Sequence, residues 1–164
     1  MIDIQIRRAL PADIETVSSI LTEAARYLDS IGQPLWQAEH ISRKSIAQDV
    51  SNGLYHLAFH GDEAVGTWRI EEDDLVFWPD IPQGKSAFIH RLAIRRKVAG
   101  QGVVDQILDW TKCFAKSSGK DYLRLDCAIR PKLCAVYERN GFVKHSEWAF
   151  KLFRVARYEY DLHG

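Results

Sequence analysis

The segment that most constrains the fold runs from Phe88 to Val104, where a short apolar strand leads through a basic, glycine-containing turn into an amphipathic helix. The turn holds Gly100 and Gly102, and the helix repeats apolar residues at helical spacing until a stop signal at Gly119. A helix that begins this way directs several free backbone N–H groups, and the positive end of its dipole, at one point. Because glycine allows close approach to those groups, the segment predicts a seat for phosphate or pyrophosphate.

The composition supplies no bulk charge for binding nucleic acid or a membrane surface, because 22 basic residues balance 22 acidic ones among the 164 residues. No stretch approaches the ~18 apolar residues of a membrane helix, and the start of the chain carries Asp3 instead of a signal peptide's apolar core. The three cysteines, Cys113, Cys127 and Cys134, fit neither a disulfide framework nor a zinc spacing. We therefore expect a single cytoplasmic domain over residues 1–164 that binds no metal, nucleic acid or membrane.

The order of strands and helices predicts an α+β fold. Hydrophobic periodicity and turn residues divide the chain in the order β-α-α-β-β-β-α-β-α-β-β. One β-α-β crossover over 88–128 brings two parallel strands side by side. The predicted strands are 2–7, 54–59, 64–71, 88–94, 122–128, 148–153 and 158–162, and the predicted helices are 11–31, 40–50, 103–118 and 131–140.

The strand His-Arg-Leu-Ala-Ile, the turn Arg-Arg-Lys-Val-Ala-Gly-Gln-Gly and the later block Ala-Val-Tyr-Glu-Arg-Asn-Gly-Phe resemble the GCN5-related N-acetyltransferase (GNAT) superfamily. The resemblance covers nearly the whole chain, from Ile4 to the last strand. It implies a mixed, mostly antiparallel sheet of six to seven strands flanked by about four helices, with a splayed central parallel pair. It also implies acetyl-coenzyme A as co-substrate, a small-molecule, amino-acid or peptide amine as acceptor and, as in many members, a homodimer.

By this resemblance the turn would bind the pyrophosphate of acetyl-coenzyme A, in one of two registers. Lys97–Gly102 retains both glycines and a basic first residue, whereas Ala99–Val104 keeps the usual distance from strand to helix. We favour the second register, because geometry sets the loop length and the binding groups are mostly backbone N–H. The expected cofactor contacts are Leu92, Ala93 and Ile94 on the strand, Ala99, Gly100, Gln101, Gly102, Val103 and Val104 in the turn, and Arg130, which stands where the family often has asparagine.

The same resemblance implies that Tyr137 donates a proton or hydrogen bond to the leaving thiolate. A base is also needed, since a lysine-like amine with a pKa near ~10.4 is almost fully protonated at pH 7. Phe88 occupies the position where some members have a glutamate, and it cannot act as a base. Arylalkylamine-type members have a His-x-His-x-Leu-Ala-Val strand, and His90 falls on its second histidine, so this resemblance implies His90 as the base, with Glu71 and Glu72 as alternatives. A histidine that only orders the sheet is an equally good interpretation of His90.

In resembling proteins the acceptor pocket lies between the first two helices and the strands around 68–90. Trp36 and Trp68 are candidate contacts for the apolar body of an amine, and Glu71 for its charge. Core packing is the competing interpretation of both tryptophans. Two functions stay open from the sequence: an acetyl-coenzyme A-dependent N-acetyltransferase, which we favour, and a non-catalytic acyl-coenzyme A binding module on the same scaffold.

Overall fold

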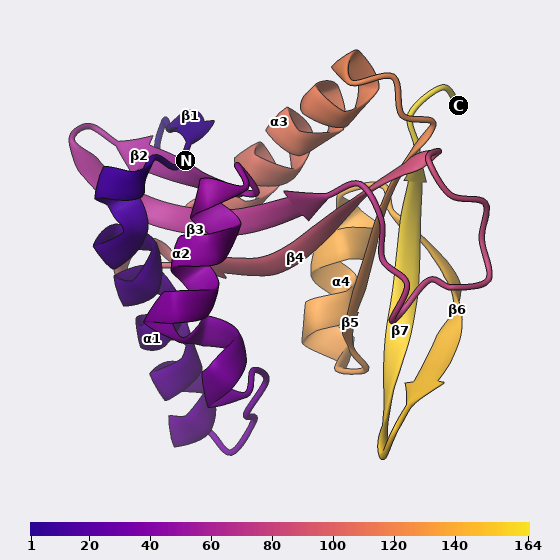
Figure 1. Ribbon diagram of the computed structural model, residues 1–164, viewed down its shortest axis with the longest axis horizontal. Coiled ribbons are helices and arrows are strands. Elements are labelled where there is room, and N and C mark those ends of the chain that lie inside the picture. Colours follow the sequence, from indigo (N-terminus) through magenta and orange to yellow (C-terminus); the bar gives the residue numbers. More distant parts are fainter. The chain divides into compact units, whose positions relative to one another are not determined.

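The computed structural model describes all 164 residues, which form seven strands and four α-helices (Figure 1). The strands follow one another in the sheet order β1-β2-β3-β4-β5-β7-β6, with β4 and β5 parallel. The pairs β1–β2, β2–β3, β5–β7 and β6–β7 are antiparallel, which confirms the predicted mixed, mostly antiparallel sheet. The elements are β1 (Gln5–Arg8), α1 (Ile14–Ser30), α2 (Arg43–Ser51), β2 (Tyr55–His60), β3 (Glu63–Glu71), β4 (Ser86–Ile94), α3 (Val103–Ser117), β5 (Tyr122–Ala128), α4 (Pro131–Arg139), β6 (Val143–Phe150) and β7 (Phe153–Asp161), with short 3-10 turns at Pro11–Asp13, Ala38–Ile41 and Arg96–Val98.

The chain forms two compact units and passes from one to the other within β3, β4 and α3. Unit 1 consists of Met1–Arg69 and Arg91–Ile107, and unit 2 of Ile70–His90 and Leu108–Gly164. The expected single domain over residues 1–164 stays a prediction. None of the helices combines the length and the apolar character that crossing a lipid bilayer requires.

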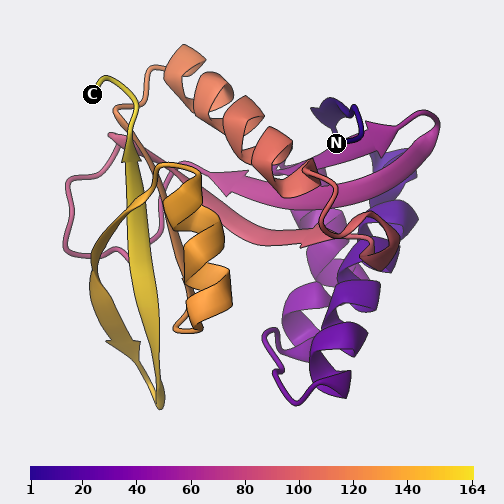
Figure 2. The same cartoon turned by 180° about the vertical axis from the view of Figure 1, so that it is seen from behind.

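Unit 1 has a hydrophobic core between its helices and its strands. The apolar stripe of α1 supplies Val17, Ile20 and Leu21, all fully buried, and α1 lies beside α2 in both views (Figures 1 and 2). Ile46 of α2 and Leu57 of β2 join the same core cluster. The periodic apolar residues that predicted these elements are therefore the ones that hold unit 1 together.

Unit 2 contains the antiparallel strands β5, β7 and β6, with α4 lying against β5 (Figure 2). The predicted strand over 148–153 is wrong in its extent. The chain turns at Lys151 and Leu152, where Lys151 has a φ of 53°, and Phe150 pairs with Phe153 across the hairpin. The first half of β6 escaped prediction because its first three residues, Val143–His145, are all exposed, so burial imposes no apolar–polar alternation there.

The parallel pair β4–β5 separates part of the way along. The ladder joins Ser86 to Tyr122 and ends where Ile89 meets Leu125, although both strands continue beyond this point. This confirms the predicted splayed pair. His90 and Asp126 are the first residues past the last paired positions, so their backbones are no longer part of a ladder with each other.

Candidate active site

The glycine-containing turn in unit 1 leads directly into the first turn of α3. Gly100 has a φ of 77° and Gly102 a φ of 80°, a left-handed conformation that residues with a side chain adopt only with strain. The helix begins at Val103, so the N–H groups of its first turn have no acceptor inside the helix. The Gln101 N–H is already used, because it donates to the Val98 carbonyl at 3.2 Å. This backbone arrangement can accept an anionic group such as a phosphate.

The end of β4 approaches β3 closely in unit 1, and this requires a glycine on β3. A Cβ added to Gly66 would lie 3.1 Å from Ile107 Cδ1 and 3.3 Å from Ile94 Cγ2. Ala93 and Ile94 belong to the predicted cofactor strand, together with the half-buried Leu92. Gly66 therefore sets how closely the cofactor strand and the start of α3 pack.

A strained residue lies in β4 immediately after His90. Arg91 has a φ of 52°, which is unusual for a residue other than glycine. Its guanidinium contacts Asp49 Oδ2 at 3.5 Å and the Tyr55 hydroxyl at 3.3 Å, and Asp49 also accepts a 2.8 Å bond from Arg69. These contacts within unit 1 hold Arg91 in the strained conformation. A kink of this kind changes the side-chain direction of the strand locally.

Unit 2 contains a group of acidic residues around His90, which we call the carboxylate–histidine cluster: Glu71, Asp74, His90 and Asp126. His90 Nε2 lies 3.5 Å from Asp74 Oδ2 and 3.9 Å from Glu71 Oε2. One side-chain oxygen or nitrogen each from Asp74, His90 and Asp126 lies within 4.8 Å of the others. The side chains of His90 and Asp74 are only 16% and 5% exposed. A half-buried imidazole that gains a proton here would therefore be stabilised by neighbouring negative charge.

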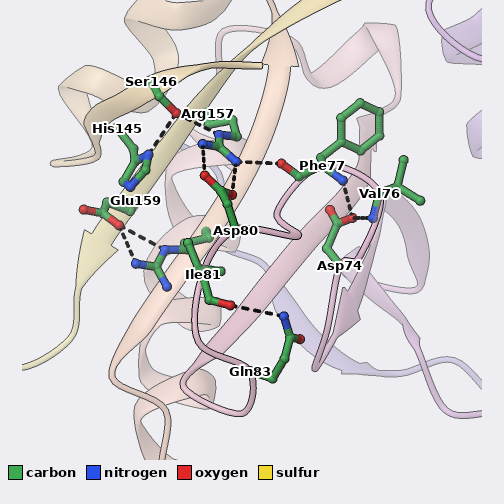
Figure 3. Close-up of polar contacts among 11 residues, drawn as sticks. Asp74, Val76, Phe77, Asp80, Ile81, Gln83, His145, Ser146, Arg157 and Glu159 are labelled. Atoms are coloured by element: carbon green, nitrogen blue, oxygen red, sulfur yellow. Dashed lines mark hydrogen bonds and ion pairs between the residues drawn. The ribbon is translucent and has the colours of Figure 1, made fainter. Parts of the chain in front are cut away.

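Asp74 reaches His90 from the irregular connection between β3 and β4, and its carboxylate is fixed by a tight turn (Figure 3). Its Oδ1 accepts the N–H groups of Val76 at 3.1 Å and Phe77 at 2.9 Å, which leaves Oδ2 on the side of His90. Charged carboxylates are the forms that such N–H donors stabilise. The sequence predicted no strand or helix between residues 71 and 88, so the position of the Asp74 carboxylate depends on the turn formed in the folded chain.

The same connection is anchored at a second place by a buried arginine of β7. Arg157 donates to Asp80 through both terminal nitrogens, at 2.7 and 3.1 Å, and to the Phe77 carbonyl at 2.9 Å (Figure 3). The guanidinium of Arg157 also lies 4.5 Å from the ring of the fully buried Trp78. Its pairing with Asp80 lowers the pKa of that carboxyl. The loop that carries Asp74 is therefore held on both sides of Phe77.

Asp126 is a site residue that the sequence analysis missed. Burial, followed by the neighbouring charge of Asp74, raises the pKa of Asp126 to about 7. In the sequence, Asp126 stands in the alternating strand Tyr122–Ala128 and looks like a residue on a solvated face. The available signal in the sequence was Arg124, a second charged residue two positions earlier and therefore on the same face of the strand. The structure shows that Arg124 is buried.

Tyr137 lies in the last turn of α4 and is buried in unit 2. Its ring packs edge-on against Phe142, with centroids 6.0 Å apart, and beside Tyr158 at 6.2 Å. Burial, together with the nearby Cys127 and Asp126, raises the pKa of the Tyr137 phenol well above its usual value. Tyr137 therefore stays protonated at neutral pH and is available as a hydrogen-bond donor.

The remaining predicted residues are distributed over both units. Arg130 precedes α4 as its N-cap residue, and its carbonyl accepts the Cys134 N–H at 2.9 Å. Trp36 is half-buried against the core of unit 1. Trp68 is fully buried and stacks on His56, with ring centroids 5.7 Å apart, and burial lowers the pKa of His56 to about 4. Because the Trp68 ring has no exposed surface to offer an acceptor, we leave it out of the proposed site.

A metal site is a second chemical interpretation of the carboxylate–histidine cluster, since its oxygen and nitrogen atoms are ligand types that divalent cations bind. The 3.5 Å contact, however, places His90 Nε2 directly beside Asp74 Oδ2, close enough for an ion pair between an imidazolium and the carboxylate. The expectation that no metal is bound stays a prediction.

Comparison with known proteins identifies a matching family, a related sequence and several solved structures of the same fold. Residues 17–142 match the model of the acetyltransferase (GNAT) family. The uncharacterized N-acetyltransferase YesJ of Bacillus subtilis is 27% identical over 143 residues, which cover 82% of this chain and 78% of YesJ. A GNAT-family acetyltransferase of Listeria monocytogenes has a TM-score of 0.80 at 20% identity, covering 98% of this chain and 95% of its own. The PaiA N-acetyltransferase of Thermoplasma acidophilum, solved with coenzyme A, has a TM-score of 0.77 at 15% identity, covering 98% and 99%. The chain therefore belongs to the acetyltransferase (GNAT) family and is an acyltransferase.

Proposed function

We propose that the protein transfers the acetyl group of acetyl-coenzyme A to the primary amine of a small molecule, amino acid or peptide. The observation that carries the proposal is the pairing of His90 with Asp74 and Glu71, next to the point where the β4–β5 ladder ends. Family membership favours an enzyme over the non-catalytic binding module. The Thermoplasma relative, which binds coenzyme A, supports the choice of acyl donor.

Acetyl-coenzyme A supplies the thioester, and the turn before α3 would hold its pyrophosphate through backbone N–H groups. The Lys97–Gly102 register places Gly100 and Gly102 at the two glycine positions of the family pattern, whereas the Ala99–Val104 register places Gly102 and Val104 there. Gly100 and Gly102 both have the left-handed conformation that favours glycine, and this supports the Lys97–Gly102 register. Val104, the last residue of the alternative register, lies inside α3. We therefore propose the Lys97–Gly102 register in place of the one favoured from the sequence, with Leu92, Ala93, Ile94 and Arg130 as further contacts.

His90 would remove a proton from the acceptor amine, which arrives as an ammonium ion at neutral pH. Asp74 and Glu71 favour the imidazolium that forms and hold the ring in place. Tyr137 would donate a hydrogen bond to the thiolate of departing coenzyme A. Because its pKa is raised, Tyr137 acts by stabilising the thiolate and does not need to lose its own proton.

The acceptor proposed here is an amine with an apolar body. Glu71 and Asp74 would attract the ammonium group. Phe77, whose N–H binds Asp74, belongs to an aromatic group with Phe150 and Phe153, with ring centroids 5.4 and 6.3 Å from Phe77. Phe153 is 48% exposed, so this aromatic group offers an apolar surface. The surface begins at Phe77, three residues after Asp74 in the same tight turn.

The test is a screen of aliphatic, aromatic and polar amines, amino acids and peptides with acetyl-coenzyme A, in which thiol release and the mass of the product are measured. We expect apolar primary amines to be acetylated. Phe153→Ala should raise the KM of these amines about 5- to 10-fold, as removal of one apolar contact predicts, and leave kcat unchanged. Leu35→Ala, which alters an exposed apolar residue of unit 1, is the control. Tight coenzyme A binding without turnover of any amine would contradict the proposed function.

A further inference from the structure

Acetylation of an ammonium ion requires that two protons leave the nitrogen. The overall change is RNH3⁺ + CH3CO–SCoA → CH3CO–NHR + CoASH + H⁺. One proton leaves before the amine can attack, and a second leaves as the C–N bond forms. One of the two ends on the sulfur of coenzyme A and the other in solvent. A single base must therefore give up the first proton before it can accept the second, or the site must contain a second proton acceptor.

A second titratable side chain lies beside His90. Asp126 is on β5, at the first position past the end of the β4–β5 ladder, as His90 is on β4. Its carboxylate oxygen and His90 lie within 4.8 Å of each other, a separation that one water molecule or a small side-chain movement can bridge. His90 and Asp126 are the next positions in the register of the ladder, so their side chains lie on the same face of the sheet.

The two aspartates of the cluster have different surroundings. Asp74 accepts two backbone N–H bonds on Oδ1, and these donors favour its charged form. Asp126 is half-buried beside the negative charge of Asp74, and the loss of solvent together with that charge raises its pKa to about 7. The two carboxyl groups are therefore suited to different tasks, Asp74 as a fixed charge and Asp126 as a carrier of protons.

The charged and titratable groups around Asp126 are consistent with this division. Glu71, Asp74 and His90 belong to the cluster, and Tyr137 on α4 interacts electrostatically with Asp126. Arg157, the residue opposite Asp126 on β7, directs its guanidinium to Asp80, Phe77 and Ser146. Its charge is therefore already compensated by Asp80.

We propose that Asp126 is the second proton carrier of the active site, which receives the first amine proton from His90 and so restores His90 as a base for the second. The transfer breaks the N–H bond of the imidazolium and forms the O–H bond of the Asp126 carboxyl, without any oxidant or other reactant. Asp126 later releases this proton to solvent. This inference rests on the proposed function and adds a residue that the sequence analysis did not select.

A titration by NMR tests the proton sharing without any acceptor. In protein with ¹³C-labelled aspartate carboxyls, the signal lost in Asp126→Asn identifies Asp126. We expect it to titrate near pH 7, and the His90 ring signals to show an inflection at the same pH that disappears in Asp126→Asn. Asp121→Asn, which changes a surface aspartate beside Lys85, is the control. An Asp126 signal that titrates near pH 4, with an unchanged His90 curve, would overturn the proposal.

Kinetics with an amine from the screen tests the relay itself. Asp126→Asn should lower kcat about 10- to 100-fold at unchanged coenzyme A affinity, and remove one ionisation from the pH profile of kcat. Because the relay acts through His90, His90→Gln/Asp126→Asn should be no slower than His90→Gln within about 3-fold. Additive losses, or activity that EDTA abolishes and Zn²⁺ restores, would overturn the relay. If the wild type acetylates no amine, the proposed function fails, and the NMR titration decides alone whether the two groups share a proton.

Discussion

The glycine turn before α3 and the carboxylate–histidine cluster reach their function in opposite ways. The turn is continuous in sequence and acts through backbone N–H groups, so the glycines at positions 100 and 102 predict it from the sequence alone. The cluster takes its side chains from the end of β3, the loop after it, β4 and β5. Binding through backbone N–H groups tolerates substitution of the surrounding side chains. The cluster, in contrast, depends on the identity of each of its four side chains. Cofactor binding and proton transfer should therefore respond separately to mutation.

The largest expected effect is on catalysis. His90→Gln should lower kcat/KM roughly 10²- to 10⁴-fold, because the acceptor then loses the group that takes its first proton. Coenzyme A affinity, measured by calorimetry, should stay within about 2-fold. His163→Gln is the matched control, since His163 also lies near an aspartate, at 3.2 Å from Asp121, but is exposed. Equal activity of His90→Gln and the wild type would mean that His90 only orders the sheet.

The second effect concerns stability and its dependence on pH. The folded-state pKa of Asp126 is raised from 3.8 to about 7, so the folded protein binds more protons than the unfolded chain between these values. Wild-type stability should therefore fall as the pH rises through this range. Asp126→Asn should be more stable than the wild type above pH 7, by up to about 4 kcal/mol, since one pKa unit corresponds to about 1.4 kcal/mol.

Urea unfolding at pH 4, 6 and 8 measures this difference. It should be small at pH 4, where the Asp126 carboxyl is largely protonated in the folded protein and about half protonated in the unfolded chain, and should grow toward pH 8. A difference that does not change with pH would contradict the raised pKa, and with it the distinction between Asp126 and Asp74.

The third effect is confined to the turn. Gly102→Arg should weaken coenzyme A binding about 100-fold or more, or about 2.7 kcal/mol, because the side chain would occupy the phosphate seat. A Cβ at Gly102 meets Met1 Cγ at 2.9 Å, so Gly100→Arg, with open space at its Cβ, is a second variant. Gly84→Arg, with a similar φ of 82° and open surroundings, controls for backbone strain. Unaltered binding in both turn variants would exclude the turn as the pyrophosphate site.

The smallest expected effect is that of Tyr137→Phe. Loss of one hydrogen bond to a charged sulfur should lower kcat about 10- to 100-fold, since such bonds are worth about 1.5–3 kcal/mol. Coenzyme A affinity should hardly change. Tyr160→Phe is the control, because Tyr160 also packs against Phe142, at 5.6 Å. If kcat is the same in both variants, Tyr137 has only a packing role.

Much of this architecture could be predicted, and the exceptions have physical reasons. The apolar stripe of α1 and the strand Tyr122–Ala128 were found because burial imposes a period on the sequence. The first half of β6 was missed because an exposed strand shows no such period. His90 and Glu71 were chosen as separate candidates, and the structure places their side chains 3.9 Å apart. Trp68 was chosen for its chemistry, but it is a buried core residue.

The sequence by itself determined the order of elements, the glycine turn and the family resemblance, because each of these is a local pattern. Only the tertiary structure decided which acidic residues surround His90. The position of the Asp74 carboxylate depends on a turn within an irregular loop, and that of Asp126 depends on the point where the β4–β5 ladder ends. Distances across strands and the burial of a carboxyl are products of folding, and they set the electrostatics by which one aspartate stays charged while the other can carry a proton.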